Sequence, residues 1–296
     1  MSRTTIVQAV QSGRILVSDG AWGTFLQQKG LQPGECPELW CVERPADVAD
    51  IARRYLDAGA DLIESNSFGG TRLKLAHYGL AGRTAEINRA AARLSRAAAG
   101  PDRWVIASMG PTGQMLLMEE ITEAEMFDAF REQAVALAEG GADALCIETM
   151  TAADEAALAV RAAREHTAAE VICTFTFDRT AQGTYRTMMG LSPADAARAA
   201  LDAGAHVVGT NCGNGMAGMI EIVREMRAAF PAAPILVHAN AGLPQTVGGV
   251  NTWPEGPEQM AAQVPALLAA GAQIVGGCCG TTPEHIRAIR RAVDGR

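Results

Sequence analysis

The feature that most constrains this chain is an eightfold alternation of short apolar runs with helical segments. The runs are rich in β-branched residues, and they are RILVSDG (14–20), DLIESNSF (61–68), WVIASMGP (104–111), DALCIET (143–149), EVICTFTF (170–177), AHVVGTNC (205–212), PILVHAN (234–240) and QIVGGCCG (273–280). Strands that are apolar throughout are typical of a parallel sheet covered on both faces. Eight such strands, each followed by a helix, predict an α/β fold, a single-domain (β/α)8 TIM barrel.

The punctuation between the runs supports this prediction. Helical spacing is found in residues 47–58, 84–98, 122–139, 152–166 and 193–203. AGAD, GGAD, AGAH and AGAQ each precede a strand, and their glycines are expected to end a helix in the left-handed conformation. Thr122 with Glu125 predicts a capping box, and Ser-Pro at 192–193 and Thr-Pro at 282–283 predict helix starts. A doubly wound open sheet is the alternative, but no G-x-G-x-x-G follows the first run.

Composition excludes several functional classes. The net charge is −8, and no cluster of lysine and arginine suggests a nucleic-acid partner. The N-terminus lacks a long apolar signal segment, and no stretch approaches the 18 apolar residues of a membrane span. We therefore expect no nucleic acid, no membrane and a cytoplasmic location. Without a linker or charge run to divide the chain, residues 1–296 are expected to form one domain.

The seven cysteines are an odd number in a chain without an export signal, so a disulfide framework is a poor interpretation. Cys146 and Cys173 lie inside apolar runs, where burial explains them. The other notable cysteines follow strands. Cys212 ends the sixth predicted strand and the pair Cys278 and Cys279 ends the eighth.

Three cysteines are therefore expected to converge at one rim of the barrel, where catalytic groups of such barrels lie. Other polar groups end strands there too, including Asp19, Glu64, Glu148 and His238. Three thiolates suit Zn²⁺ and leave a fourth tetrahedral position open, which is typical of a catalytic site. The alternatives are a strained disulfide between Cys278 and Cys279, or three buried cysteines without a metal.

Several motifs resemble the homocysteine S-methyltransferase family, which includes betaine-homocysteine methyltransferases, S-methylmethionine-dependent enzymes and the homocysteine-binding module of cobalamin-dependent methionine synthase. The resemblance spans about residues 15–289. Its motifs are DGAWGT (19–24), DLIESNSFGGTR (61–72), SMGPTG (108–113), GGADALCIET (140–149), RTMMG (186–190), TNCG (210–213), HANAGLP (238–244) and GGCCGTTP (276–283). The resemblance implies that residues 1–296 form a homocysteine-binding, zinc-dependent barrel.

By this resemblance Cys212, Cys278 and Cys279 are the zinc ligands, and the homocysteine sulfur takes the fourth position. Coordination removes the thiol proton, so a thiolate nucleophile exists at neutral pH. Asn240 matches a family asparagine near the metal. His238 beside it has the alternative of a hydrogen-bonded core histidine.

The resemblance also implies how the amino-acid end is bound. Asp19 and Glu148 match acidic positions that hold the ammonium group, while the backbone N–H groups of Gly23 and Thr24 lie where they would take the carboxylate. An alternative for Glu148 is a structural ion pair with an arginine at the rim, Arg72 or Arg186.

The expected reaction moves a methyl group from a small donor to homocysteine, giving methionine. The motifs are most similar to the bacterial branch of betaine enzymes, so betaine is the expected donor. A quaternary ammonium calls for aromatic side chains, and the candidates are Trp22, Phe25, Trp40, Phe68, Tyr78 and Trp253. Alternatives are a sulfonium donor such as S-methylmethionine, a corrinoid protein on another chain that would make this the homocysteine-activating subunit of a split methionine synthase, or zinc and amino-acid binding without catalysis.

Overall fold

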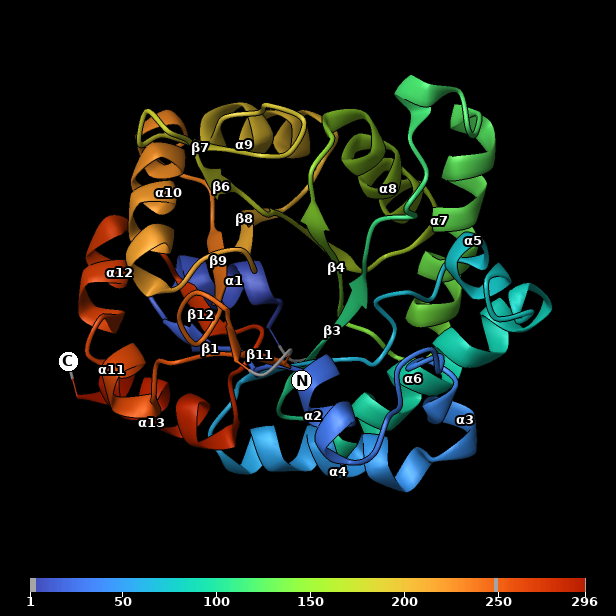
Figure 1. Ribbon diagram of the computed structural model, residues 1–296, viewed down its shortest axis with the longest axis horizontal. Helices are drawn as coiled ribbons and strands as arrows, with labels where there is room; N and C mark the ends of the chain where they lie inside the picture. Colours follow the sequence, from blue (N-terminus) through green and yellow to red (C-terminus); the bar gives the residue numbers. More distant parts are fainter. Residues whose placement is uncertain (1–3, 248–249, 296) are drawn as a thin grey trace.

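In the computed structural model, which describes residues 4–247 and 250–295, the eight predicted strands form one parallel sheet around a central axis (Figure 1). They are β1 (Leu16–Val17), β2 (Leu62–Glu64), β3 (Trp104–Met109), β4 (Ala144–Met150), β5 (Glu170–Phe175), β8 (Val207–Asn211), β9 (Ile235–Ala239) and β12 (Ile274–Gly277). The strand order is β1-β12-β9-β8-β5-β4-β3-β2, and a parallel bridge between Ser18 and Leu62 joins its two ends. The predicted single-domain (β/α)8 barrel is confirmed.

Helices surround the sheet on its outer side (Figure 1). The longer ones are α4 (Pro45–Asp57), α6 (Thr84–Ala99), α7 (Glu123–Glu139), α8 (Ala153–His166), α9 (Pro193–Asp202), α10 (Met216–Ala229), α12 (Val264–Ala270) and α13 (Pro283–Asp294). Shorter helical segments are α1 (Ile6–Gln11), α2 (Gly23–Gln28), α3 (Trp40–Glu43), α5 (Arg72–Ala76), η1 (Ala81–Arg83), η2 (Leu116–Met118) and α11 (Pro257–Ala261). Two small antiparallel hairpins, β6 (Asp178–Arg179) with β7 (Tyr185–Arg186) and β10 (Gln245–Val247) with β11 (Val250–Thr252), complete the list.

The helix boundaries follow from the predicted caps. Thr122 forms a capping box with Glu125, and Ser192 and Thr282 cap the helices that begin with the next proline. The glycine of each repeated turn before a strand has a positive φ, as expected: 102° at Gly59, 101° at Gly141, 105° at Gly204 and 117° at Gly271. These turns bring each helix back along the sheet, and so they set the parallel direction of the strands.

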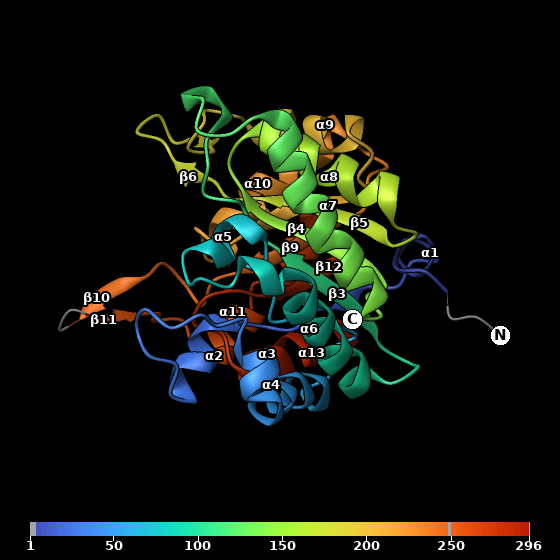
Figure 2. The same cartoon turned by 90° about the vertical axis from the view of Figure 1, so that its right-hand side faces the viewer.

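Buried apolar side chains form two main clusters. One cluster lies between the sheet and the helices and includes Cys173, and a second lies within the barrel and includes Cys146. Both cysteines are fully buried, as predicted. Helix α1 packs on the second cluster at one end of the barrel. There Glu170 accepts hydrogen bonds from the backbone N–H groups of Ile6 and Val7. Figure 2 shows α1 and the β10–β11 hairpin at opposite ends of the molecule.

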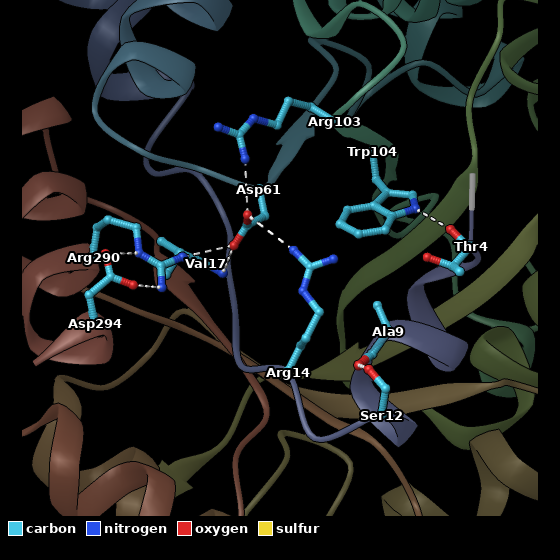
Figure 3. A network of polar contacts seen from close by, with 10 residues as sticks. All are labelled: Thr4, Ala9, Ser12, Arg14, Val17, Asp61, Arg103, Trp104, Arg290 and Asp294. Carbon is cyan, nitrogen blue, oxygen red and sulfur yellow. Dashed lines mark hydrogen bonds and ion pairs between the residues drawn. The ribbon is translucent and has the colours of Figure 1, made fainter. Parts of the chain in front are cut away.

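At the end of the barrel near α1, the buried carboxylate of Asp61, which directly precedes β2, links β2 to β1 (Figure 3). Asp61 accepts a hydrogen bond from the backbone N–H of Val17 and pairs with Arg103 and Arg290, while Arg14 lies 3.8 Å away. Because β1 contributes only two residues to the sheet, this network supplements a short ladder. The polar groups at this end serve the closure of the barrel, and the strand ends at the opposite rim are left for chemistry.

No helix within the described ranges is long and apolar enough to cross a bilayer. Of the predicted domain 1–296, residues 1–3, 248–249 and 296 lie outside the part of the chain that the structure describes.

Candidate metal and substrate site

The three predicted cysteines meet at the carboxyl ends of two strands. Cys212 directly follows β8, and Cys278 and Cys279 directly follow β12. Their sulfur atoms all lie within 4.8 Å of one another, and Cys212 Sγ is 3.9 Å from Cys279 Sγ. All seven cysteines are free thiols, so the alternative of a disulfide between Cys278 and Cys279 is not found.

The backbone around the cysteines is adapted to this convergence. Cys212 has a φ of 57°, which is unusual for a residue other than glycine, and its N–H donates to the His238 carbonyl. On the other strand, a Cβ atom on Gly277 would lie 2.3 Å from the Thr281 hydroxyl. Glycine at 277 therefore lets the chain turn tightly after β12 and presents both following cysteines at the rim.

The donor set fits a tetrahedral metal ion that prefers sulfur. Two sulfur atoms bound to one Zn²⁺ at about 2.3 Å are separated by about 3.8 Å in a tetrahedron, and the observed 3.9 Å is close to this value. Hydrogen bonds from the Cys278 and Cys279 thiols lower the pKa of Cys212 to about 3, and the same hydrogen bonds raise the pKa of Cys278, so the three sulfur atoms share protons. Asn240, which hydrogen-bonds Cys212, has a buried Oδ1 without a hydrogen-bond partner.

A cavity of about 290 Å³ joins the three cysteines to a wall of acidic residues. Glu64, Glu148 and His238 line it, and one potential ligand atom of each lies within 4.8 Å of the others. This second group is a further set of residues that could hold a cation. Gly23 and Thr24, predicted to bind the substrate carboxylate, line the same cavity.

Glu148 is held by neighbours on two strands. Ser108 on β3 donates to its Oε1, and the Asn211 amide on β8 donates to its Oε2 at 3.2 Å. Burial and the nearby Glu64 raise the pKa of Glu148 well above its usual range. Arg72 pairs instead with Glu132, and Arg186 donates to the Tyr185 carbonyl, so neither of the alternative arginine partners pairs with Glu148.

Asn211 also fixes the backbone beside Glu148. Thr149 has a φ of 61°, and the ladder between β4 and β5 shifts register between Ile147 and Met150. The side-chain Oδ1 of Asn211 accepts from the Thr149 N–H, and its side-chain amide N–H donates to the Thr149 hydroxyl at 2.7 Å. This bonding supports a strained backbone at the strand end, which is where such strain commonly serves function.

Asp19 lies behind the cavity wall. Its carboxylate accepts hydrogen bonds from Trp22 Nε1, the Glu64 N–H and the Ser18 hydroxyl, at 2.8, 2.9 and 3.2 Å. It is 1% exposed and is not among the described residues that line the cavity. Burial raises the pKa of Asp19, although the charge of His238 and the three donors oppose this.

Glu64 is the residue that sequence reasoning did not assign. It was visible as a polar end of a strand, but nothing nearby in sequence indicates a role. Its Oε1 is buried without a hydrogen-bond partner, 3.4 Å from Nδ1 of His238. Burial and the charge of Asp19 raise the pKa of Glu64 well above its usual range. His238 is buried as a core histidine would be, yet its Nε2 also lacks a partner.

Two of the six candidate aromatic residues reach the cavity, Trp22 and Phe68. Phe25 packs edge-on against Tyr55, and the Arg44 guanidinium lies over the Trp40 ring. The other two, Tyr78 and Trp253, do not line the cavity; Trp253 packs against Gly280.

Known proteins resemble this chain over nearly its whole length. The family model described as "Homocysteine S-methyltransferase" matches residues 16–293. Methionine synthases of Mycobacterium leprae and Mycobacterium tuberculosis are each 33% identical, over 95% and 96% of this chain. The chain spans about a quarter of the length of these curated relatives, 24% and 25%.

Among solved structures, the homocysteine methyltransferase MmuM from Escherichia coli is similar in fold. Its metallated form has a TM-score of 0.78 at 23% identity and covers 96% of this chain and 98% of its own. Its oxidised form has a TM-score of 0.76 at 24% identity, with 97% and 99% covered. At these identities the likeness concerns the fold.

Proposed function

Because the chain belongs to the homocysteine S-methyltransferase family, we propose that it transfers a methyl group from a small donor to the thiolate of L-homocysteine, giving methionine. The resemblance predicted from the sequence motifs is confirmed at the level of the family. The observation that carries the proposal is the meeting of Cys212, Cys278 and Cys279 at one end of a cavity with an acidic wall. Such a cavity suits a ligand with a thiol at one end and a positive charge at the other.

Cys212, Cys278 and Cys279 would hold Zn²⁺, because three thiolates at these separations match its preferred ligands. A bound zinc ion would lower the pKa of an incoming thiol, so that the thiol loses its proton at neutral pH. Asn240 supports the assignment, since its unpartnered Oδ1 lies in a side chain that hydrogen-bonds Cys212. It would serve as a polar partner close to the metal when substrate is absent.

The rest of the cavity would bind the amino-acid end of homocysteine. Glu148 lines the cavity and Asp19 adds negative charge from behind the wall, so together they favour an ammonium group. Gly23 and Thr24 stand at the start of α2, where N–H groups have no partner within the helix, and would take the carboxylate. In this proposal the homocysteine-binding domain is residues 1–296.

The methyl transfer is a direct displacement. The homocysteine sulfur forms a bond to the methyl carbon as the bond from that carbon to the donor's positively charged atom breaks, and the bonding electrons stay with the donor. No general base is needed, because the thiol proton has already left. The chain contributes by binding and aligning the two substrates in one cavity, which removes much of the entropic barrier.

Betaine is the proposed donor, and two aromatic residues support it. Trp22 and Phe68 line the cavity, and aromatic faces attract quaternary ammonium groups. A second candidate is favoured by the relatives, since the methionine synthases contain this region as about a quarter of their length. In that case the methyl group would come from a corrinoid protein, and this chain would be the homocysteine-activating subunit.

A donor panel separates these functions. The zinc-loaded protein is incubated with homocysteine and, in turn, betaine, dimethylsulfoniopropionate, S-methylmethionine or methylcobalamin, and methionine is measured. Cys278→Ala serves as the background control. Methionine from betaine supports the proposal; methionine from methylcobalamin alone supports the subunit. No methionine from any donor contradicts a self-sufficient enzyme.

A further inference from the structure

One buried hydroxyl connects the cluster of three cysteines to the loop after β1. We propose that Thr281 is a positioning residue that fixes the distance between the cysteines and the amino-acid-binding part of the cavity, and so selects homocysteine by its length over thiol amino acids one carbon shorter or longer. The inference rests on the proposed function, because it assumes a thiol amino acid that spans these two parts. It adds a determinant of specificity that does not touch the substrate.

Thr281 lies in a turn that begins at one of the clustered cysteines. Its N–H donates to the Cys278 carbonyl at 3.1 Å, and its hydroxyl donates to the same carbonyl at 2.7 Å. Gly280, the third residue of this turn, has a φ of 81°, which is typical of a type II turn. The Thr281 side chain is 3% exposed and is not among the described residues that line the cavity. Thr281 is therefore fixed relative to Cys278, although it lies outside the space that a ligand would fill.

The same hydroxyl holds the loop after β1. Its oxygen accepts a hydrogen bond from the Ala21 N–H at 3.1 Å. A hydroxyl can donate and accept at once, so one side chain joins the Cys278 carbonyl to the Ala21 amide. Ala21 lines the cavity and is followed closely in sequence by Gly23 and Thr24. The link therefore runs from the cysteine cluster to the loop at which the substrate carboxylate is proposed to bind.

A tyrosine on α4 secures Ala21 from the other side. The Tyr55 hydroxyl donates to the Ala21 carbonyl at 2.7 Å and lies 3.4 Å from the Thr281 carbonyl. Tyr55 is fully buried, and its ring packs edge-on against Phe25 of α2. The N–H and the carbonyl of Ala21 are thus both bound by buried hydroxyls. Ala21 cannot shift without breaking one of these bonds, which would leave a buried polar group without a partner.

The link extends the connection between β1 and β12, which lie side by side in the barrel (Figure 1). At the rim the Gly277 N–H donates to the Asp19 carbonyl at 2.8 Å. Both chain segments then pass close to the Thr281 hydroxyl. A Cβ atom on Gly20 would lie 2.6 Å from Thr281 Oγ1, and one on Gly277 would lie 2.3 Å from it. These distances are too short for a real Cβ atom, so glycine at both positions lets the hydroxyl lie between the two segments.

A fixed distance selects a ligand by its length. The homocysteine sulfur would bind at the three cysteines and its carboxylate at the loop after β1, so the carbon chain between them has to match the spacing. One methylene more or less in a fitted site is worth about 10- to 200-fold in discrimination. That discrimination requires the two anchor points to be rigidly connected, because a loop free to move would follow a shorter or longer ligand.

The test measures a length profile with three thiol amino acids: cysteine, homocysteine and 2-amino-5-mercaptopentanoate, which has one carbon more than homocysteine. Calorimetry gives their dissociation constants on zinc-loaded protein, and zinc is determined before and after each titration. The wild-type protein should bind homocysteine at least about 10-fold more tightly than either of the others. Thr281→Val keeps the shape of the side chain but removes its hydrogen bonds. It should retain one equivalent of zinc and reduce the preference for homocysteine about 5- to 10-fold.

Three further variants complete the design. Thr281→Ser keeps the hydroxyl and should keep the preference for homocysteine. Tyr55→Phe removes the second bond to Ala21 while keeping the aromatic ring, and should also reduce the preference. It provides the test if Thr281→Val does not fold. Thr282→Val is the matched control, because the Thr282 hydroxyl donates to Glu284 at the start of α13 instead, and it should keep the preference.

The outcomes distinguish the inference from the function beneath it. If the wild-type protein binds none of the three thiols, the proposed function fails. If it prefers homocysteine and Thr281→Val weakens all three thiols by the same factor, Thr281 serves stability alone and our inference is overturned. A wild-type protein that binds all three thiols equally also overturns it. So does loss of zinc from Thr281→Val with zinc retained in Thr282→Val, because Thr281 would then act on the cysteine cluster itself.

Discussion

Cys212 Sγ lies 3.9 Å from Cys279 Sγ, although the two residues are separated by 67 positions in sequence. The contact exists because β8 and β12 both flank β9 and end at the same rim of the barrel. It brings three thiols together at one point of the rim.

The first prediction concerns metal content. Cys212→Ser should reduce zinc from one equivalent per chain to well below it after dialysis, because two thiolates hold zinc much more weakly than three. Zinc is measured by atomic absorption on the purified protein. Cys36→Ala is the control, since Cys36 bonds to Glu38 away from the cluster, and it should keep one equivalent. Equal zinc in both variants would contradict the assignment.

The second prediction concerns the amide that supports Glu148. Asn211→Ala removes the bonds to Thr149, Thr174 and Glu148. We expect the free energy of unfolding to fall by about 2–4 kcal/mol, since a buried hydrogen-bond network is broken. Homocysteine affinity should fall as well, because Glu148 loses its support. Urea denaturation and calorimetry measure the two effects. Thr210→Val on the same strand should leave homocysteine affinity unchanged, and a similar loss there would show that the effect is not local.

The third prediction is that Glu64 destabilises the empty protein. Its pKa is raised on folding, so the folded state holds this proton more tightly than the unfolded state. Its contribution to stability therefore falls as pH rises above its ordinary pKa of 4.5, until the raised pKa is passed. Glu64→Gln should stabilise the metal-free protein by about 1–3 kcal/mol at pH 8 and by less at pH 5. Thermal unfolding at both pH values measures this, and a stabilisation that does not grow with pH would contradict it.

The fourth prediction concerns the pH dependence of substrate preference. Burial raises the pKa of both Glu64 and Glu148, and protons on these carboxyls compete with the ammonium group. The comparison compound is 4-mercaptobutanoate, which is homocysteine without the ammonium group. Homocysteine binding should therefore strengthen relative to 4-mercaptobutanoate binding as pH rises from 5.5 to 8. Both thiols share the deprotonation of sulfur, so the ratio of their dissociation constants isolates the acidic wall. A ratio independent of pH would mean that the wall does not contact the ammonium group.

The fold could be predicted from sequence because each barrel unit carries a local signal. Thr122 with Glu125 and the Ser-Pro and Thr-Pro pairs mark helix starts through bonds between near neighbours, which a sequence shows directly. The short hairpins and the helices α2, α3 and α5 were not predicted, because two to six residues are too few to show a period. Except for β4, the strands are also shorter than their apolar runs, since polar residues at their ends turn into the rim loops.

The site was predictable only in part. Topology brings the ends of strands to one rim, so the approach of Cys212 to Cys278 and Cys279 follows from the barrel. Whether a carboxylate faces a cavity depends instead on partners that are distant in sequence. Asp19 accepts a hydrogen bond from the N–H of Glu64, 45 positions away, and does not line the cavity, whereas Glu64 lines it with a buried Oε1 that has no hydrogen-bond partner. No local sequence motif indicates which of these two carboxylates lines the cavity.

The central claim is that three cysteines of this chain bind zinc and that the homocysteine sulfur joins them. X-ray absorption at the zinc edge, recorded before and after addition of homocysteine, tests it most directly. The account predicts three sulfur neighbours at about 2.3 Å and one lighter atom, changing to four sulfur neighbours with homocysteine. A shell of nitrogen and oxygen alone, or a sulfur count that homocysteine leaves unchanged, would contradict it.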